Sequence, residues 1–315
     1  MKKTGFLILA ALLFTVSRAH AQGCNDAGLC GMGDLDGRRL GTGSQYNTQL
    51  SYFFGLGEQQ ILINTIQFEQ RFAFMEDRGQ VFLQLPFHYI YGKLGNTYGV
   101  GDVSLGVNYT YLKKDDLAAS FLIAGKLPSN GSDKTIDEKV APMVYQSSLG
   151  TYDLALGANL FYQKWQFGLG YLKPFGSNQN NFDPSEWQGN NDAEEFIQMS
   201  DLKRGDDAMI RVNRFFYSKK NRFNTGLLAL YRMQKDIVKQ NGGPVALKDS
   251  DGLTLNINLG YYRVLKNKDA VTLSVAAPLI TREVRVDGLT RNFVMMFTYA
   301  FGKKEKSMFD SIKFN

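Results

Sequence analysis

The stretch Leu253-Thr254-Leu255-Asn256-Ile257-Asn258-Leu259-Gly260-Tyr261 alternates strictly between large apolar residues and small or polar ones. Successive side chains of a β-strand point to opposite faces, so this stretch predicts a strand with one apolar face and one polar face. The segment 103–111 repeats the pattern, and two tyrosines end its apolar face. Aromatic residues gather in this way at the surface of a lipid bilayer. Both segments are therefore typical of strands that cross a membrane.

Working outward from this stretch, the same period of two recurs along most of the chain. It predicts twelve strands, over residues 46–55, 60–74, 80–92, 101–112, 117–128, 151–162, 165–175, 206–217, 222–235, 252–264, 270–280 and 290–301. Single-chain bacterial barrels have an even number of antiparallel strands. The sequence therefore predicts an all-β fold, a transmembrane antiparallel up-and-down β-barrel of twelve strands over residues 46–302.

The connections between these strands alternate between short and long. The short ones are 76–79, 113–116, 163–164, 218–221 and 266–269, and the long ones are 92–100, 129–150, 176–205 and 236–251. Outer-membrane barrels have short periplasmic turns and longer extracellular loops, whereas a soluble sandwich has no reason to sort its loops. This alternation favours a barrel in a bilayer.

The first 21 residues have the features of an export signal. Lys2 and Lys3 precede an apolar run over 6–16, and Ala19-His20-Ala21 fits the small-x-small rule for cleavage. The apolar run is too short to span a bilayer as a helix. We expect a signal peptide over 1–21, a periplasmic segment over 22–45 and a charged tail over 303–315. The expected location is the outer membrane of a Gram-negative bacterium.

The charge of the chain gives little support to nucleic-acid binding. The formal net charge is +6, and loss of the leader with Lys2, Lys3 and Arg18 lowers it to +3. The remaining basic residues lie mostly in turns, at strand ends and in the tail, not in one patch. A nucleic-acid-binding protein usually carries a concentrated basic stripe or patch.

Cys24 and Cys30 are the only cysteines, and both follow the expected cleavage site. In an oxidising compartment, two nearby cysteines are typical of a local disulfide. A metal or redox role would need further ligands, and no histidine lies near them. Lipidation of Cys24 is a third alternative, although Ala21 stands where a Leu-like residue is usual.

Several polar residues occupy strand positions that alternate with the apolar ones, so they are expected to face the lumen. The predicted lumen polar cluster is Gln67, Glu69, Arg71, Gln84 and His88, and further lumen candidates are Lys126, Arg211, Asn213 and Arg232. A basic residue facing lipid at the bilayer midplane costs about 2 to 4 kcal/mol, which favours the inward orientation. Such a cluster either fills the barrel as a salt-bridge network or contacts a ligand.

No catalytic, cofactor-binding or metal-binding motif accompanies these strands. His88 is the only histidine after the leader, its neighbours offer no serine, and no Gly-x-Ser-x-Gly sequence occurs. The acidic residues of the long loops do not have the spacing of a Ca²⁺ loop. The sequence therefore does not predict an enzyme.

Three segments carry a family resemblance: Gly99-Val100-Gly101-Asp102-Val103-Ser104-Leu105-Gly106, Gly125-Lys126-Leu127-Pro128-Ser129-Asn130-Gly131, and Ser148-Leu149-Gly150-Thr151-Tyr152-Asp153-Leu154. They resemble the G-x-G-D, L-P-x-G and L-G-T-G-x-x-D signatures of the MetA-pathway-of-phenol-degradation family, which is related to the long-chain fatty acid transporters. Ser129-Asn130 interrupts the usual Pro-Thr-Gly, and Tyr152 replaces a glycine. The resemblance implies an outer-membrane barrel that passes small hydrophobic or aromatic molecules.

The leading hypothesis is a channel or transporter that lets a small hydrophobic or amphipathic compound cross the outer membrane by diffusion. A barrel of twelve strands is intermediate in width between a narrow barrel whose interior is filled by side chains and a wide barrel that encloses an aqueous channel. Selectivity is expected from the lumen charges and from three loop aromatics, Phe175, Phe182 and Trp187. The alternative is a non-transporting structural or docking barrel in a secretion or envelope complex, with a protein partner bound through the segment 22–45 or the tail.

Overall fold

A computed structural model describes residues 46–301 except 77, 219–220, 241, 267–268 and 287–290. The long strands are β1 (Tyr46–Gly57), β2 (Leu62–Phe74), β3 (Gly79–Gly92), β5 (Val103–Lys113), β6 (Leu117–Leu127), β9 (Tyr152–Tyr162), β10 (Trp165–Phe175), β13 (Asp207–Ser218), β14 (Asn221–Arg232), β17 (Gly252–Val264), β18 (Ala270–Ile280) and β19 (Arg291–Phe301). Each overlaps one predicted segment. The expected leader, the segment 22–45 with Cys24 and Cys30, and the tail 303–315 lie outside the described residues.

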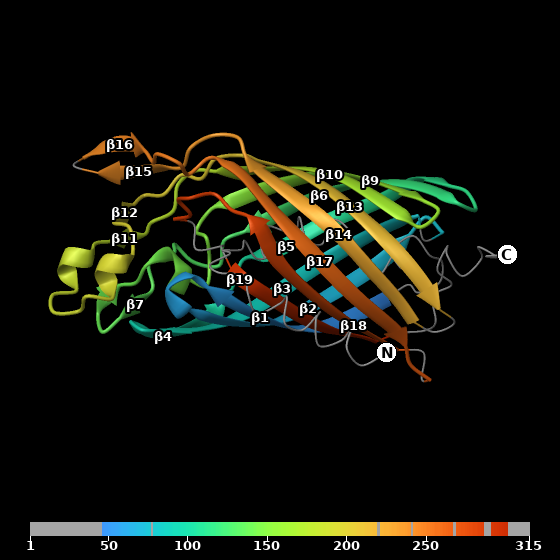
Figure 1. Cartoon of the computed structure of the whole chain (residues 1–315), viewed down its shortest axis with the longest axis horizontal. Helices are drawn as coiled ribbons and strands as arrows, with labels where there is room; N and C mark the ends of the chain where they lie inside the picture. Colours follow the sequence, from blue (N-terminus) through green and yellow to red (C-terminus); the bar gives the residue numbers. More distant parts are fainter. Residues whose placement is uncertain are drawn as a thin grey trace, which may run out of the picture.

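These strands form one antiparallel sheet that closes on itself (Figure 1). Sequential strands pair with each other around the ring, and β1 also pairs with β19, with Tyr52 opposite Phe297. Closure gives every barrel strand two hydrogen-bonded neighbours, which is a condition for crossing lipid with strands. The predicted twelve-stranded antiparallel β-barrel is confirmed. Among the described residues, no helix is long and apolar enough to span a bilayer.

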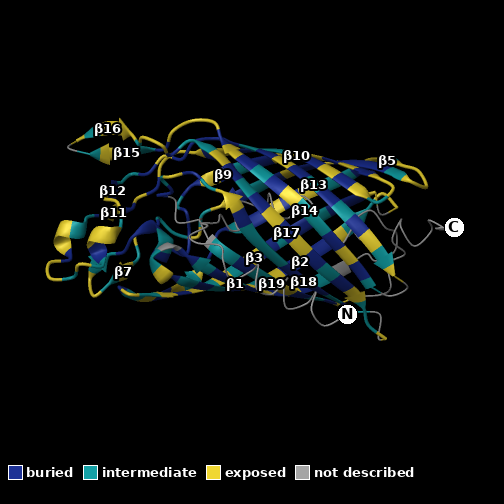
Figure 2. Ribbon diagram, viewed as in Figure 1, coloured by how far each residue is buried: buried dark blue, intermediate teal, exposed yellow. Residues whose placement is uncertain are grey.

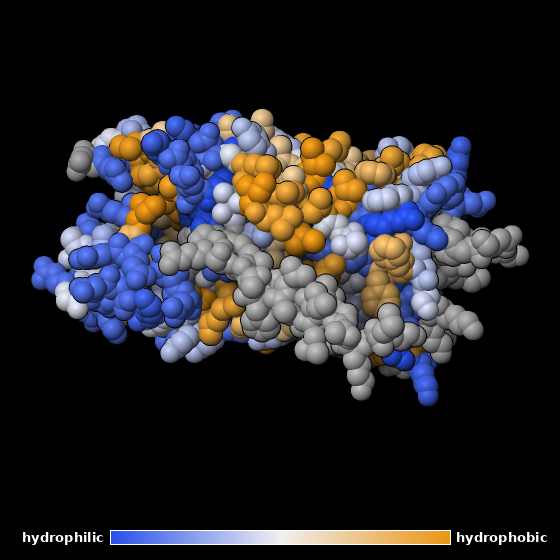
Figure 3. All heavy atoms as spheres, in the orientation of Figure 1, coloured by the Kyte–Doolittle hydropathy of each residue, from blue (hydrophilic) through white to orange (hydrophobic). Residues whose placement is uncertain are grey.

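Burial alternates along the strands as the period of two predicts (Figure 2). On β17, Leu253, Ile257 and Leu259 are exposed, whereas Thr254, Asn256 and Asn258 are buried in the barrel interior. Apolar side chains gather on the outside around the middle of the barrel, and polar ones cover its loop-bearing end (Figure 3). The outer surface thus matches a lipid environment and the interior is mainly polar.

The connection over 92–100, expected to be a loop, is instead a hairpin. Residues Gly95–Val100 form β4, which pairs with the upper part of β3 and places Tyr98 opposite Tyr89. Both β4 and β5 pair with β3, and the register of this pairing shifts by one residue between them. Phe87 lies opposite Val100, whereas Gln84 lies opposite Ser104. Pro86 has no N–H to continue the ladder, and its carbonyl accepts from Gly101 N. This bulge sets the position of Asp102.

The other long connections fold into a cap at one end of the barrel, which we call the loop cap and define as residues 128–151, 176–206, 233–251 and 281–286 (Figure 1). Its short elements are β7 (Thr135–Ile136), β8 (Lys139–Val140), η4 (Met143–Tyr145), β11 (Asn181–Phe182), η5 (Pro184–Glu186), η6 (Ala193–Glu195), β12 (Met199–Ser200), β15 (Ile237–Gln240) and β16 (Gly243–Ala246), and η3 (Glu58–Gln60) lies nearby. Ile61, Ile90, Tyr145 and Phe182 belong to one apolar cluster between cap and barrel. The cap is therefore packed rather than open.

Candidate functional site

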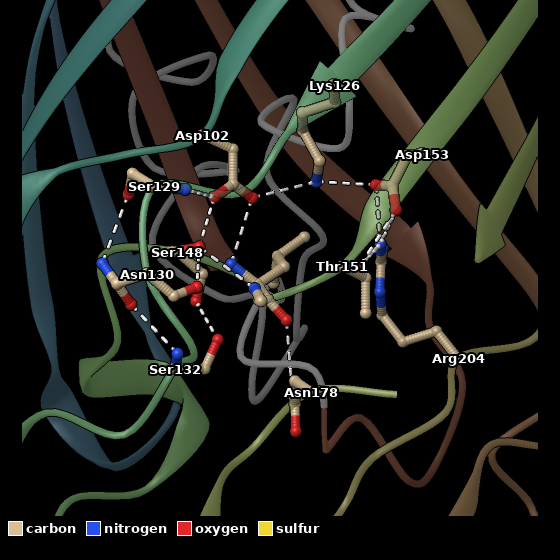
Figure 4. Close-up of polar contacts among 12 residues, drawn as sticks. Asp102, Lys126, Ser129, Asn130, Ser132, Ser148, Thr151, Asp153, Asn178 and Arg204 are labelled. Atoms are coloured by element: carbon tan, nitrogen blue, oxygen red, sulfur yellow. Dashed lines mark hydrogen bonds and ion pairs between the residues drawn. The ribbon is translucent and has the colours of Figure 1, made fainter. Parts of the chain in front are cut away.

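Four buried charged side chains form a chain at the neck of the barrel, where strands meet the loop cap (Figure 4). Lys126 Nζ lies 2.7 Å from Asp153 Oδ2 and 3.3 Å from Asp102 Oδ2. Arg204 Nη2 lies 2.6 Å from both carboxylate oxygens of Asp153. We call Asp102, Lys126, Asp153 and Arg204 the neck network. The close contacts between its acids and bases offset part of the cost of burying these charges.

Asp102 also binds the loop cap through hydrogen bonds. One of its oxygens accepts from the Ser148 hydroxyl and, at 3.4 Å, from Ser129 N, and the other accepts from Leu149 N at 3.0 Å. The Thr151 hydroxyl donates to Asp153 at 3.0 Å. The three sequence segments that carry the family resemblance therefore converge on this network (Figure 4). Their common physical role is to hold the cap on the barrel.

A second charged group, the rim network, lies where β13 and β14 meet the cap. Arg232 donates to both oxygens of Asp207, at 2.6 and 3.0 Å, and also pairs with Asp236. Arg282 lies 3.7 Å from Asp236 and donates to the Ser250 carbonyl at 2.6 Å. Arg232 was expected to face the lumen, and it is buried inside the barrel mouth as part of this network.

The lumen polar cluster is divided between two levels of the β2–β3 pair. Glu69 lies directly opposite Gln84, accepts from its amide at 2.6 Å and pairs with Arg71 on its own strand. His88 lies four residues further along β3, opposite Thr65, with 2.7 Å between His88 Nδ1 and the Thr65 hydroxyl. Gln67 lies between the two groups and is half-buried. Glu69, Arg71 and Gln84 thus form one group, and His88 belongs to another.

A belt of amide side chains crosses the interior of β9, β10, β13 and β17. Asn213 donates to Gln166 at 2.8 Å, accepts from Asn258 at 3.1 Å, and Gln166 donates to Asn159 at 3.4 Å. Arg211 is buried beside this belt. It lies opposite Gly168, and because glycine has no side chain, the Arg211 side chain has room there. These amide side chains are mutually hydrogen-bonded, as buried polar groups usually are.

Part of the interior wall is apolar, which the alternation of apolar and polar residues did not predict. The buried side chains of this apolar wall come from β3, β6, β9, β10, β13 and β14, and they are Phe82, Leu122, Ala124, Ala155, Leu172, Met209, Leu228 and Leu230. A smaller cluster on the same side contains Ala118, Phe161 and Phe215. Across the ring, β18, β19 and β1 present Ser274, Thr298 and Ser51 beside the buried apolar residues Val294 and Phe53. The interior therefore has an apolar region on the same strands that carry the amide belt and the charged networks.

The hypothesis that three loop aromatics select a ligand needs correction. Phe182 and Trp187 are buried within the loop cap, where their rings pack 6.4 Å apart, and the Trp187 indole N–H donates to the Val140 carbonyl at 3.3 Å. Phe175 is exposed on the outward face of β10. Two of the rings build the cap and the third points away from the lumen, so none of them lines a path into the barrel.

Comparison with known proteins supports the fold. No protein-family model and no curated protein matches the chain, so the family resemblance stays a prediction. Among solved structures, the COG4313 outer membrane channel from Pseudomonas putida F1 is similar with a TM-score of 0.57 and 14% identity, over 83% of this chain and 95% of that one. The NanC porin gives a TM-score of 0.43 and 10% identity, over 81% and 97% of the two chains. The first similarity places the fold among outer-membrane barrels.

Proposed function

We propose that this barrel is a channel for the passive or facilitated passage of a small hydrophobic or amphipathic compound across the outer membrane. The observation that carries the proposal is the apolar wall of the interior, from Phe82 on β3 to Leu228 and Leu230 on β14. Lumens of general porins are polar and water-filled. An apolar wall next to hydrogen-bonding side chains suits a molecule with one apolar and one polar part.

On this proposal, the polar part of the passing molecule contacts the other side of the interior. Thr272 and Ser274 on β18 and Thr298 on β19 supply hydroxyl groups there. The lumen polar cluster around Glu69 and the buried Arg211 would set which polar groups are accepted. Lipid of the outer membrane would surround the exposed apolar face of the strands.

The test is uptake of radiolabelled 4-fluorophenol by cells of a Gram-negative host that lacks its general porins. Cells that produce the barrel should accumulate the probe faster than cells with an empty vector. The double variant Leu122→Asn, Leu228→Asn places two amides on the apolar wall, and we expect it to slow uptake by about ten-fold, which corresponds to ~1.4 kcal/mol. Heat-modifiable electrophoretic mobility would verify that the variant barrel has folded.

The matched control is Leu122→Met, Leu228→Met, which keeps the wall apolar and nearly conserves side-chain volume. This control should take up the probe at the wild-type rate. The proposal fails if the Asn variant is folded and as active as wild type, or if wild-type cells accumulate the probe no faster than cells with an empty vector.

A further inference from the structure

A cavity of about 240 Å³ lies in the loop cap, lined by four separate connections of the barrel. They contribute Gln59 from the β1–β2 connection, residues 142–144 from the β6–β9 loop, residues 195–199 from the β10–β13 loop and residues 283–286 from the β18–β19 connection. The lining residues are thus far apart in the sequence. Folding of the cap is what brings them together.

Eight of the twelve residues that line this mouth cavity are apolar. Its apolar members are Pro142, Met143, Val144, Phe196, Ile197, Met199, Val284 and Val286. Met143, Met199 and Val286 are buried and belong to one apolar cluster, whereas Ile197 is 44% exposed. The cavity therefore has a buried apolar floor, and a large apolar side chain remains accessible at its border. Such a combination is typical of a site for a small molecule.

Four polar residues complete the lining: Gln59, Glu195, Glu283 and Arg285. The Gln59 amide donates to the Glu195 backbone carbonyl at 3.4 Å, and the Glu195 carboxylate lies 3.3 Å from Lys93 Nζ. Hydrogen bonds to Asp192 and Glu195 raise the pKa of Lys93. Gln59 and Glu195 are thus held at the accessible border of the cavity, where they can orient the polar end of a ligand, whereas Arg285 is buried.

The size of the cavity limits what it can hold. An apolar cavity of about 150 Å³ accommodates benzene, and sites for drug-sized ligands begin at about 300 Å³. The value for this protein lies between the two. Met143 and Met199 have flexible, polarizable side chains, which adapt to ligands of different outline. A single substituted ring or a short alkyl chain fits this space, and a lipid with a long acyl chain does not.

We propose that the mouth cavity binds a small, mainly apolar molecule, about the size of one substituted aromatic ring, before it passes into the barrel. This inference rests on the proposed channel function and adds to it a loading site and a substrate class. The ligand's ring would lie on the Met143, Met199 and Val286 floor. Its polar substituent would face Glu195 and Gln59 at the border.

The experiment measures binding of 4-fluorophenol to the barrel in lipid nanodiscs by fluorine NMR, with empty nanodiscs as the blank. Wild-type protein should broaden the probe signal in a saturable manner beyond the blank. Ile197→Trp adds a bulky ring at the accessible border of the cavity, and we expect it to weaken binding by about ten-fold. Val245→Trp is the matched control, because Val245 is also exposed but lies on the β15–β16 hairpin outside the cavity lining. The control should bind like wild type.

Two results would overturn the mouth site: no saturable broadening with wild-type protein, or equal binding by Ile197→Trp and Val245→Trp. These outcomes are separable from failure of the channel proposal, because binding is measured without transport. If binding is saturable and Ile197→Trp weakens it, but cells do not take up the probe, the proposed mouth site stands and the channel proposal is rejected. If cells with the wild-type barrel take up the probe but Ile197→Trp binds 4-fluorophenol as well as wild type, the channel proposal stands and the proposed mouth site is rejected.

Discussion

Replacing Asp153 with alanine is expected to release the segment 176–206 from the barrel and expose it to protease. The substitution removes the buried carboxylate that both Arg204 and Lys126 contact at the neck. Removing one partner of a buried ion pair costs about 3 to 5 kcal/mol. Cleavage of a folded protein follows the population of locally opened molecules. Trypsin should therefore cut after Lys203 at least about ten-fold faster than in wild type.

The matched control is Asp192→Ala, in the same segment. Asp192 pairs with Lys93 at 2.9 Å, but both side chains are more than one-third exposed. Exposed ion pairs contribute about 0 to 1 kcal/mol, so this variant should be cut at nearly the wild-type rate. Equal rates for wild type and Asp153→Ala would show that the neck network does not hold the cap.

The barrel strands could be predicted from the sequence because lipid and lumen impose opposite demands on alternate residues. This constraint acts on each strand by itself, so β5 and β17 could be identified without knowing their neighbours. β4 was missed because Gly95 and Gly99 are typical of a loop. Gly95 has a φ of 132°, which suits the tight turn that folds β4 back on β3.

The neck network could be predicted only in part from the sequence. Asp102, Lys126 and Asp153 lie at strand ends within recognisable segments, and Lys126 could be assigned to the lumen by alternation. Arg204 lies in a long connection with no period, so no local pattern indicates that it reaches Asp153. Pairing of residues 51 apart depends on how the cap packs, which is a property of the tertiary structure.

The loop aromatics illustrate the same limit. Phe182 and Trp187 lie in a connection rich in polar residues, where aromatic side chains suggest a ligand-binding surface. In the folded protein, however, both rings pack into an apolar cluster with Ile61, Ile90 and Tyr145 from other parts of the chain. The mouth cavity is lined instead by residues from four separate connections, mainly aliphatic residues and methionines with one aromatic ring, Phe196, and no local pattern indicates that they meet.

Replacing Gly226 with alanine is expected to destabilise the barrel itself. Gly226 lies on β14 directly opposite Asn213, and an added methyl group would overlap both the Asn213 carboxamide and the Val212 carbonyl oxygen. Overpacking of this kind costs about 1 to 3 kcal/mol. The midpoint of urea unfolding in lipid vesicles should therefore fall. Gly125→Ala on β6 is the matched control, since nothing lies within 4 Å of its added methyl group.

A second variant tests the overlap with the Val212 carbonyl oxygen separately from the overlap with the Asn213 carboxamide. Asn213 is held by hydrogen bonds to Gln166 and Asn258, so its carboxamide cannot simply rotate away. In Asn213→Ala, Gly226→Ala the carboxamide overlap is gone, but the overlap with the Val212 backbone carbonyl remains. We therefore expect the double variant to stay less stable than Asn213→Ala alone. Equal midpoints for these two variants would mean that β13 and β14 can move apart, and the tight packing of the amide belt would then not depend on glycine at position 226.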